Sequence, residues 1–288
     1  MPTIKKAIMP VAGFGTRFLP VTKAQPKEMI PIVDKPVIQF LVEEAVNSGI
    51  EEIILVTGAS KRAIEDHFDR NFELEYRLKQ GGKDDSLKLV KDISDLARFV
   101  YVRQKEQLGD GHAVLQAKQL IQNEPVAIIF GDDIIDQPTP YLKEMIEIYE
   151  KYKDPVIALG EVPKSEVSNY GVIKGKEIED NLFQIMKFVE KPKPKDAPSN
   201  LVFVGRVIMT PELLKVLENS EAGLKDGEIR MADAFRKLIE TRVMYGHKFS
   251  GTWYNCGNKL EYLKAVVNYG LRHPEVKDGF KKYLKDIK

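Results

Sequence analysis

The chain has 288 residues, of which 43% are hydrophobic, and carries a formal net charge of +1. This near-neutral balance gives no overall field that would attract nucleic acid or a membrane surface, and the apolar runs are too short to span a bilayer. The single cysteine, Cys256, excludes an internal disulfide and a cysteine-based zinc cluster. We therefore expect a protein of the reducing cytoplasm that binds neither nucleic acid nor membranes.

Strand-like and helix-like segments alternate through the first half of the chain. Short apolar runs rich in branched residues predict buried strands at Ile4–Met9, Ile53–Thr57, Phe99–Val102 and Val126–Phe130. Apolar residues at helical spacing predict helices over Val37–Val46 (ended by Gly49), Ser60–Phe68 (capped by Ser60), Val114–Ile121 and Pro140–Tyr152. This alternation predicts a largely parallel sheet with right-handed crossovers.

The pattern changes after Val156. Strand-like pieces with little helix between them follow at Gly171–Lys174, Phe183–Val189 and Val202–Met209, and helices return at Pro211–Glu218, Met231–Glu240 and Lys259–Leu271. Two stretches have a composition typical of loops, Gln80–Asp92 and Lys191–Asn200. We predict one α/β domain with two halves, 1–155 and 156–258, and a C-terminal helical segment over 259–288.

A glycine turn follows the first predicted strand. Gly13 and Gly15 would let backbone N–H groups approach an anion, and Thr16 with the cations Arg17, Lys23 and Lys27 comes directly after them. The third glycine of a dinucleotide fingerprint is absent, and so is the Gly-Lys-Ser/Thr of a P-loop. The residues indicate either a polyphosphate site or a solvated basic loop.

Several strings in fixed order make the chain resemble the sugar-1-phosphate nucleotidyltransferases, and most closely their bacterial UTP–glucose-1-phosphate uridylyltransferase branch. The strings are AGFGTRFLPVTKAQPKEMIPIVDKP, KRAIEDHFD, VRQKEQLGDGHAV, GDD, NYGVI, FVEKPKPKDAPSN, GEIRMADAF and CGNKLEYLKA. The resemblance implies a Rossmann-like nucleotide-diphospho-sugar transferase fold. Its central sheet would be mixed but mostly parallel, flanked by helices, with a small additional β region.

The resemblance also implies roles for matching positions. The nucleotide would be held by Ala12, Gly13, Gly15, Thr16, Gln104 and Gly109, and its triphosphate by Arg17 and Lys27. The sugar phosphate would be held by Tyr170, Gly171, Glu190 and Lys191. Catalysis would rest on Arg17, Lys27, Asp132 and Lys191. The 1–155 half would then bind mainly nucleotide and the 156–258 half mainly sugar phosphate, while Glu228 and Asp233 lie in a family motif without an assigned role.

Asp132 follows a predicted buried strand, so its carboxylate should emerge at the edge where open α/β sheets bind ligands. The resemblance makes it a Mg²⁺ ligand, and carboxylate oxygen suits that ion, with Asp133 and Asp136 as nearby alternatives. Many relatives have a second aspartate where this chain has Asn255. An amide oxygen can coordinate Mg²⁺ without charge, so Asn255 is a weaker candidate ligand.

The implied reaction joins UTP and α-D-glucose 1-phosphate to give UDP-glucose and pyrophosphate by direct in-line displacement with Mg²⁺. A thymidylyltransferase making dTDP-glucose is the nearest alternative, because Gln104 could serve either base. A catalytically weak homologue that binds nucleotide sugars is another, and only Asn255 favours it. The resemblance further implies a homodimer or homotetramer.

Overall fold

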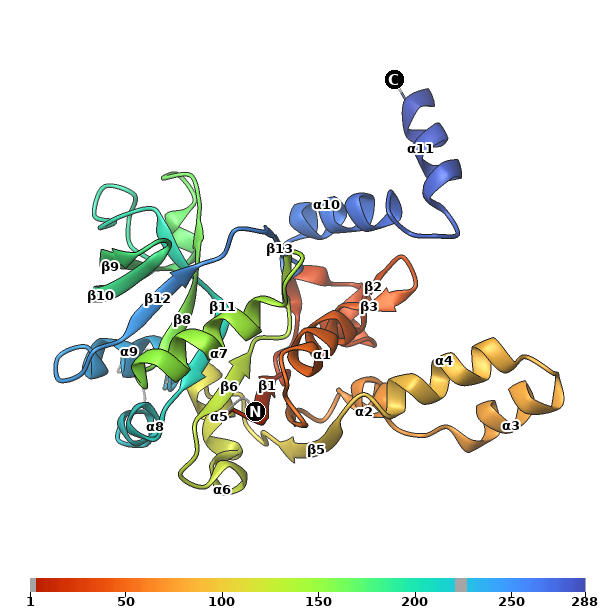
Figure 1. The fold of residues 1–288 in the computed structure, drawn as a ribbon, viewed down its shortest axis with the longest axis horizontal. Helices are drawn as coiled ribbons and strands as arrows, with labels where there is room; N and C mark the ends of the chain where they lie inside the picture. The colour runs from red at the N-terminus through yellow and green to blue at the C-terminus, as the bar shows by residue number, and fades with distance from the viewer. Residues whose placement is uncertain (1–3, 221–226, 288) are drawn as a thin grey trace.

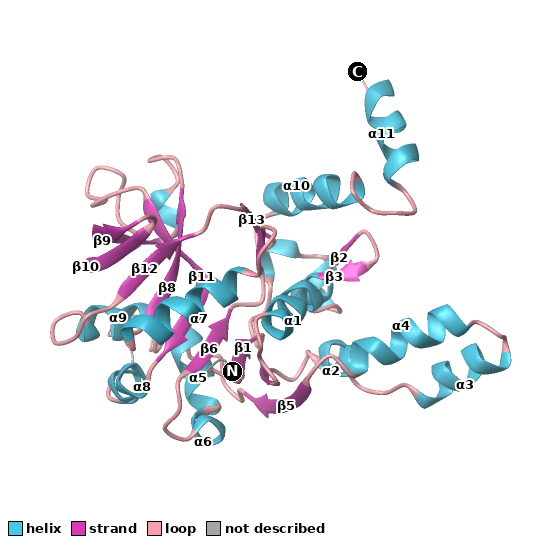
Figure 2. Cartoon of the chain, in the orientation of Figure 1, coloured by secondary structure: helices cyan, strands magenta, loops and turns pink. Residues whose placement is uncertain are grey.

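The computed structural model describes residues 4–220 and 227–287. Within these residues, one nine-stranded sheet has the strand order β5-β4-β1-β6-β11-β8-β12-β10-β9 and carries helices on both faces (Figures 1 and 2). Its strands are β1 (Lys6–Pro10), β4 (Glu52–Thr57), β5 (Arg98–Arg103), β6 (Val126–Ile129), β8 (Val156–Glu161), β9 (Gly171–Glu179), β10 (Leu182–Glu190), β11 (Leu201–Met209) and β12 (Tyr245–Lys248). Two small two-stranded sheets are β2 (Pro31–Ile32) with β3 (Lys35–Pro36), and β7 (Asp133–Asp136) with β13 (Thr252–Asn255).

The sheet is mixed: three of its parallel pairings lie in the first half of the chain, and a fourth joins β8 to β12 in the second half. Strands β5, β4, β1 and β6 are parallel neighbours, whereas β11 runs antiparallel to both β6 and β8. The chain leaves β1 toward β4 and β5 on one side and returns with β6 on the other. This reversal of strand order creates a topological switch point between β1 and β6, where open α/β sheets hold their ligands.

Helices cover the two faces of the sheet with separate apolar cores. On one face lie α1 (Val37–Asn47), α2 (Arg62–Phe68) and α7 (Tyr141–Tyr152). On the other face lie α5 (Asp110–Gln116), α6 (Lys118–Ile121), α8 (Pro211–Glu218) and α9 (Met231–Leu238). The strands between them are buried on both sides, which explains their continuous apolar runs.

Two helical segments extend from these two layers. Helices α3 (Phe72–Gln80) and α4 (Asp84–Ser94) form a hairpin that extends away from the sheet, and α10 (Lys259–Gly270) leads to α11 (Lys277–Asp286) near the C-terminus (Figure 1).

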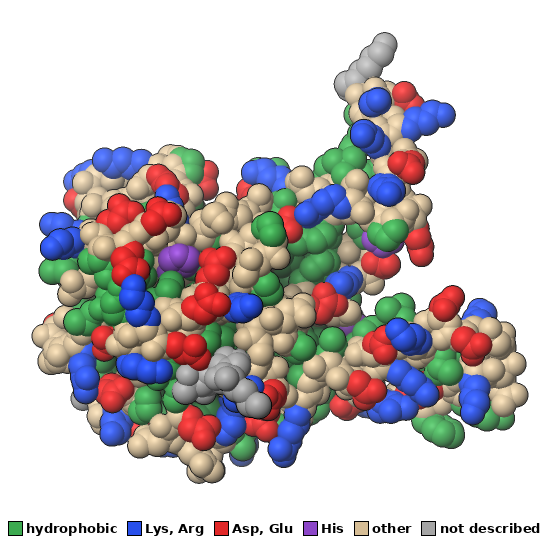
Figure 3. Space-filling model, in the orientation of Figure 1, with side chains coloured by type: hydrophobic (Ala, Val, Ile, Leu, Met, Phe, Trp, Pro, Cys, Tyr) green, Lys and Arg blue, Asp and Glu red, His purple; other side chains and the backbone are tan. Residues whose placement is uncertain are grey.

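No described helix is long and apolar enough to span a bilayer. On the face shown in Figure 3, positive and negative side chains are interspersed, in keeping with the near-neutral net charge.

The structure confirms the predicted alternation of strands and helices in the first half, with boundaries that shift by a few residues. The predicted loop at Gln80–Asp92 is wrong, because most of it is helix α4. Within α4, Leu87, Val90 and Ile93 lie at helical spacing but are only half-buried, and Leu89 is exposed. The predicted cap is also wrong, since Lys61 rather than Ser60 occupies the N-cap of α2 and makes no side-chain capping bond. The predicted loop at Lys191–Asn200 is confirmed.

A fully buried arginine ties the second half of the sheet to the first. Arg206 of β11 is 0% exposed, and its guanidinium donates to Glu44 Oε2 of α1 at 2.7 Å and to the Asp133 carbonyl at 2.7 Å. Glu44 also accepts from the backbone N–H of Leu142 in α7. Removing one partner of such a pair leaves the other as an uncompensated buried charge.

We therefore expect Arg206→Ala to lower the free energy of unfolding by about 3–5 kcal/mol, because Glu44 would stay buried without its cation. Chemical denaturation monitored by circular dichroism measures this loss. The matched control is Arg62→Ala, which removes an exposed arginine paired with Asp66 and should cause no measurable change. Equal stability of the two variants would show that the Arg206 contacts contribute little.

Candidate functional site

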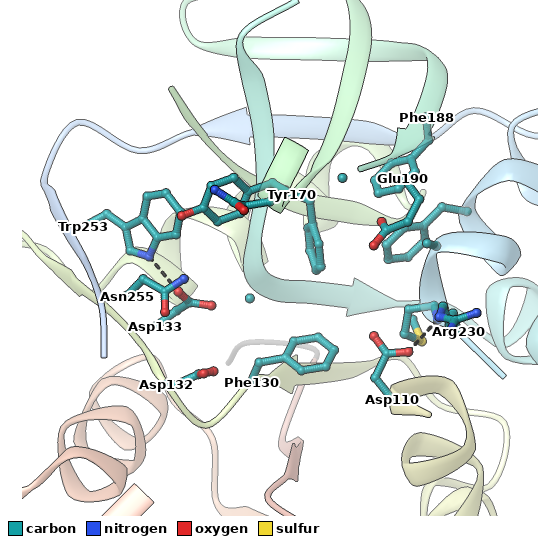
Figure 4. Close-up of a pocket in the computed structure, with 17 residues that line it drawn as sticks. Asp110, Phe130, Asp132, Asp133, Tyr170, Phe188, Glu190, Arg230, Trp253 and Asn255 are labelled. Carbon is teal, nitrogen blue, oxygen red and sulfur yellow. Dashed lines mark hydrogen bonds between the residues drawn. The ribbon is translucent and has the colours of Figure 1, made fainter. Parts of the chain in front are cut away.

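Two adjoining cavities open at the switch point. The β1-side cavity, about 310 Å³, is lined by Pro10, Ala12, Gly13, Lys27, Glu28, Gln104, Gln107, Gly109, Asp110, Ala113, Phe130, Gly131, Asp132 and Glu228. The β11-side cavity, about 210 Å³, is lined by Asp110, Phe130, Asp132, Asp133, Asn169, Tyr170, Gly171, Phe188, Glu190, Phe203, Gly205, Arg230, Met231, Ala232, Phe235, Trp253 and Asn255 (Figure 4). They share Asp110, Phe130 and Asp132, so a ligand in one could meet a ligand in the other.

The loop after β1 shapes the β1-side cavity. A side chain at Gly13 would meet no atom within 4 Å, so open space lies beside this backbone. Gly15 has φ +66°, and a Cβ there would lie 3.1 Å from the Lys27 Cβ. The glycine thus lets the stem of Lys27 pass close to the turn.

Lys27 and Asp132 form an ion pair where the cavities meet. Lys27 Nζ lies 2.6 Å from Asp132 Oδ2, and each side chain is 22% exposed. Burial acts to raise the pKa of Asp132, but the charge and hydrogen bond of Lys27 outweigh it and lower that pKa. Burial acts to lower the pKa of Lys27, and the charge of Asp132 reverses this and raises it. Both groups are therefore held in their charged forms.

The neighbouring carboxylate behaves differently. Burial and the charge of Asp132 raise the pKa of Asp133 to about 7, although Trp253 Nε1 donates to Asp133 Oδ1 at 2.7 Å (Figure 4).

Asn255 lies opposite Asp133 in the β7–β13 pairing. A Cβ added to Gly257 would overlap Asp132 Oδ2 and approach Asn255 Oδ1 to 3.0 Å, so both oxygens face the same small space. No group of three or more acidic, histidine or cysteine side chains suited to a metal occurs within the described residues.

Glu190 lines the β11-side cavity opposite Asp132 (Figure 4), and Gly171 lines the same cavity. They are partners in the antiparallel β9–β10 pairing, so the end of one strand meets the start of the other. A Cβ on Gly171 would overlap the ring of Phe188 and lie 3.1 Å from Glu190 Oε2. Only glycine at this position keeps the carboxylate accessible beside Tyr170.

The structure brings together most of the residues selected from the sequence. The β1-side cavity takes Ala12, Gly13, Lys27, Gln104, Gly109 and Asp132, and the β11-side cavity takes Tyr170, Gly171, Glu190, Asn255 and Asp132. Gly15, Thr16, Arg17 and Lys191 are not among the described residues that line either cavity. The Arg17 side chain is exposed, yet its charge contributes to the low pKa of Asp132. Lys191 is also exposed, with Nζ 3.6 Å from Glu190 Oε1.

Asp110 is a site residue that the sequence reasoning missed. It lines both cavities, and its Oδ1 accepts backbone N–H groups from Gly111 at 2.7 Å and from Met231 at 3.0 Å. Burial raises its pKa, although those hydrogen bonds act in the opposite direction. The sequence did offer one signal for it, because Asp110 directly follows Gly109, a residue already selected as nucleotide-binding. Phe130 and Trp253 were also missed, and no motif marked them.

The family profile described as nucleotidyl transferase matches residues 6–270. A UTP–glucose-1-phosphate uridylyltransferase from Staphylococcus haemolyticus is 49% identical over 287 residues, which cover 100% of this chain and 99% of that protein.

Solved structures are similar as well. A UTP-bound UGPase from Acinetobacter baumannii is 40% identical with a TM-score of 0.92, and the match covers 99% of this chain and 100% of that one. A UDP-glucose pyrophosphorylase complexed with UDP-glucose is 43% identical with a TM-score of 0.85, and the match covers 94% of this chain and 100% of that one. The fold, the two cavities and these matches agree: the chain belongs to the nucleotidyl transferase family.

Proposed function

We propose that this protein transfers the uridylyl group of UTP to α-D-glucose 1-phosphate, forming UDP-glucose and pyrophosphate. The observation that carries the proposal is the meeting of two cavities at one charged pair, Lys27 with Asp132. A nucleotidyl transfer needs such a junction, because two polyanions must be held end to end against their repulsion. Relatives at 40–49% identity are named for this activity or hold UTP.

The β1-side cavity suits the nucleotide. Gln104 and Gly109 lie where a base could be read, and the open backbone at Gly13 leaves room for it. Lys27 has three N–H donors, of which the described structure uses one on Asp132, so others remain for phosphate oxygens. Arg17 would reach the triphosphate from the exposed side of the same loop. Gly15 lies against the stem of Lys27 in that loop, and Thr16 follows it directly, where its hydroxyl would reach the same phosphates.

The β11-side cavity suits the sugar phosphate. Glu190 can accept hydrogen bonds from two sugar hydroxyls, and Gly171 keeps space for a sugar ring beside Tyr170. Lys191 follows Glu190 directly and would counter the charge of the phosphate on carbon one. In this arrangement the phosphate of the sugar points toward Asp132 and the nucleotide.

The chemistry needs cations more than it needs a base. A phosphate oxygen of glucose 1-phosphate is already ionised at neutral pH, and it attacks the α-phosphorus of UTP. A new oxygen–phosphorus bond forms, while the bond between the α-phosphorus and the pyrophosphate oxygen breaks. Lys27, Arg17 and Lys191 would align the reactants and spread the charge that develops at phosphorus. No covalent enzyme intermediate is required.

The donor set fits a magnesium ion. Asp132 Oδ2 and Asn255 Oδ1 face the same space beside Gly257, and hard oxygen ligands are those that Mg²⁺ prefers. Two protein ligands are enough for an ion that takes its remaining ligands from phosphates and water. When bound, the ion would neutralise phosphate charge next to Lys27. Asp132 is its anionic ligand in this proposal, and Asn255 is the neutral one.

We also propose that the protein works in the cytoplasm as a homodimer or homotetramer. Its one cysteine, Cys256, is buried and unpaired, which suits a reducing compartment. Helices α10 and α11 expose large apolar side chains, including Leu260, Leu263 and Tyr283, which suits contact with another subunit.

The proposed reaction is tested by a substrate panel on the purified chain with magnesium. UTP, dTTP, ATP, CTP and GTP are each paired with glucose, galactose or mannose 1-phosphate, and pyrophosphate release is measured. We expect the highest kcat/KM for UTP with glucose 1-phosphate. A preference for dTTP would indicate a thymidylyltransferase, and no release with any pair would indicate a nucleotide-sugar binder.

Asp132→Ala should reduce kcat by at least about a hundredfold at ordinary magnesium concentrations, because the proposed ion and Lys27 both lose their anionic partner. Pyrophosphate release with UTP and glucose 1-phosphate measures the effect. Asp136→Ala is the control, since Asp136 lies four residues along and pairs with Arg272 outside both cavities. Near-normal turnover of the Asp132 variant would contradict this assignment.

Glu190→Gln should raise the KM for glucose 1-phosphate about tenfold or more while leaving the KM for UTP nearly unchanged. The amide keeps the shape of the side chain but replaces one hydroxyl-accepting oxygen with a donor. Initial rates with each substrate varied in turn separate the two constants. Equal increases in both KM values would argue against a sugar role for Glu190.

A further inference from the structure

Gln104 lies at the floor of the β1-side cavity in a rigid setting. It follows β5 directly, and its backbone N–H donates to the Thr57 carbonyl at 2.9 Å, which extends the pairing with β4. The residue is 4% exposed and still lines the cavity. A buried amide with one open side can present only one of its two ends to a ligand.

The nitrogen end of this amide is fully used inside the protein. Gln104 Nε2 lies 3.1 Å from the Gly109 carbonyl oxygen and 3.0 Å from His112 Nδ1. A carbonyl oxygen can only accept, so the atom facing it must be the amide nitrogen. Both hydrogens of that nitrogen are then engaged. Within the described residues, no protein donor reaches Gln104 Oε1.

The Gly109 carbonyl is itself held in place. Gly109 has φ +101°, and a Cβ there would overlap the Ile229 carbonyl oxygen, so only glycine fits. On either side of it, Ile229 N–H donates to the Leu108 carbonyl at 2.8 Å, and Gly111 N–H donates to the Ile229 carbonyl at 3.0 Å. This acceptor cannot turn away from Gln104 without disturbing two backbone segments.

The same geometry determines the tautomer of His112. Nδ1 must accept from Gln104, so the neutral ring carries its proton on Nε2. His112 Nε2 lies 3.1 Å from the side-chain amide of Gln116, one turn along α5. Gln116 Nε2 also donates to the His112 carbonyl at 3.2 Å, so this tautomer requires Gln116 to give up that bond and turn its oxygen toward Nε2. Gln116 is half-buried and holds one such carbonyl contact, whereas Gln104 is 4% exposed and its nitrogen is held by Gly109 as well.

We propose that His112 is a positioning residue for base selection: it holds the Gln104 amide so that only the carbonyl oxygen faces the nucleobase. The proposal rests on the proposed function, in which this cavity receives UTP. Uracil carries one N–H donor on its pairing edge, at N3, and Gln104 Oε1 would accept it. Cytosine carries an unprotonated acceptor at N3 and would face the same oxygen with repulsion. Thymine carries the same N3–H as uracil. The orientation of the Gln104 amide therefore selects against cytosine but does not separate UTP from dTTP.

The test measures the dissociation constants of UTP and CTP for the full-length chain by isothermal titration calorimetry. In His112→Phe the ring shape remains, but one of the two acceptors that hold the Gln104 nitrogen is lost, which lowers the cost of the flipped amide that offers this nitrogen to cytosine. We expect the preference for UTP over CTP to fall about tenfold, with weaker UTP binding. The kcat at saturating UTP should change by less than about threefold, because the base lies away from the reacting phosphorus.

Two variants separate positioning from general packing. His112→Asn supplies an oxygen acceptor for the Gln104 nitrogen and should restore most of the UTP preference. His67→Phe is the matched control: His67 is also half-buried and contacts a glutamine, with Nε2 3.0 Å from Gln39 Oε1, but it lines neither cavity. We expect its UTP preference to equal that of the unmodified chain.

An unchanged UTP preference in His112→Phe would overturn the proposal, and so would an equal loss in His67→Phe. A ratio of two dissociation constants does not depend on the fraction of folded protein, so partial unfolding cannot imitate the result. The proposed function fails on a different observation, which is no pyrophosphate release by the unmodified chain with UTP and glucose 1-phosphate.

Discussion

The ion pair between Lys27 and Asp132 is the interaction on which the rest of the site depends. Each group is largely buried, and the charge of each shifts the pKa of the other toward the charged form against the effect of burial. The pair lies where the two cavities meet, and it thus places one fixed cation and one fixed anion at the point where two phosphates would react. This arrangement allows a reaction between two anions in a partly desolvated site, because the charges are positioned before the substrates arrive.

The fold supplies this pair by bringing two loops, after β1 and after β6, to one edge of the sheet. The loop after β1 carries Lys27, and the segment after β6 carries Asp132 beside it across the switch point. Arg206 donates a hydrogen bond to the Asp133 carbonyl and forms an ion pair with Glu44 of α1. The β7–β13 pairing then brings Asn255 to the same place from the far end of the chain. Residues that stabilise the sheet, such as Arg206, therefore also fix the geometry of the site.

The sequence predicts the alternating first half well, because buried strands and two-sided helical packing leave clear periodic patterns. It fails at α4, where a helix with one narrow, half-buried apolar stripe looks like a polar loop. Motifs identified Lys27, Asp132, Gln104 and Glu190, and the structure places all of them in the cavities. Asp110 lies inside one of these motifs, directly after Gly109, and was overlooked there. Trp253 could not be found in this way, because its position depends on the pairing of β13 with the distant strand β7.

The most direct test of the account is a crystal structure of the chain with UDP-glucose and magnesium. We expect the uracil to lie in the β1-side cavity beside Gln104 and the glucose to lie in the β11-side cavity beside Glu190. The diphosphate would bridge them within reach of Lys27 and Asp132. A diphosphate bound away from this ion pair, with the two cavities empty, would contradict the central claim.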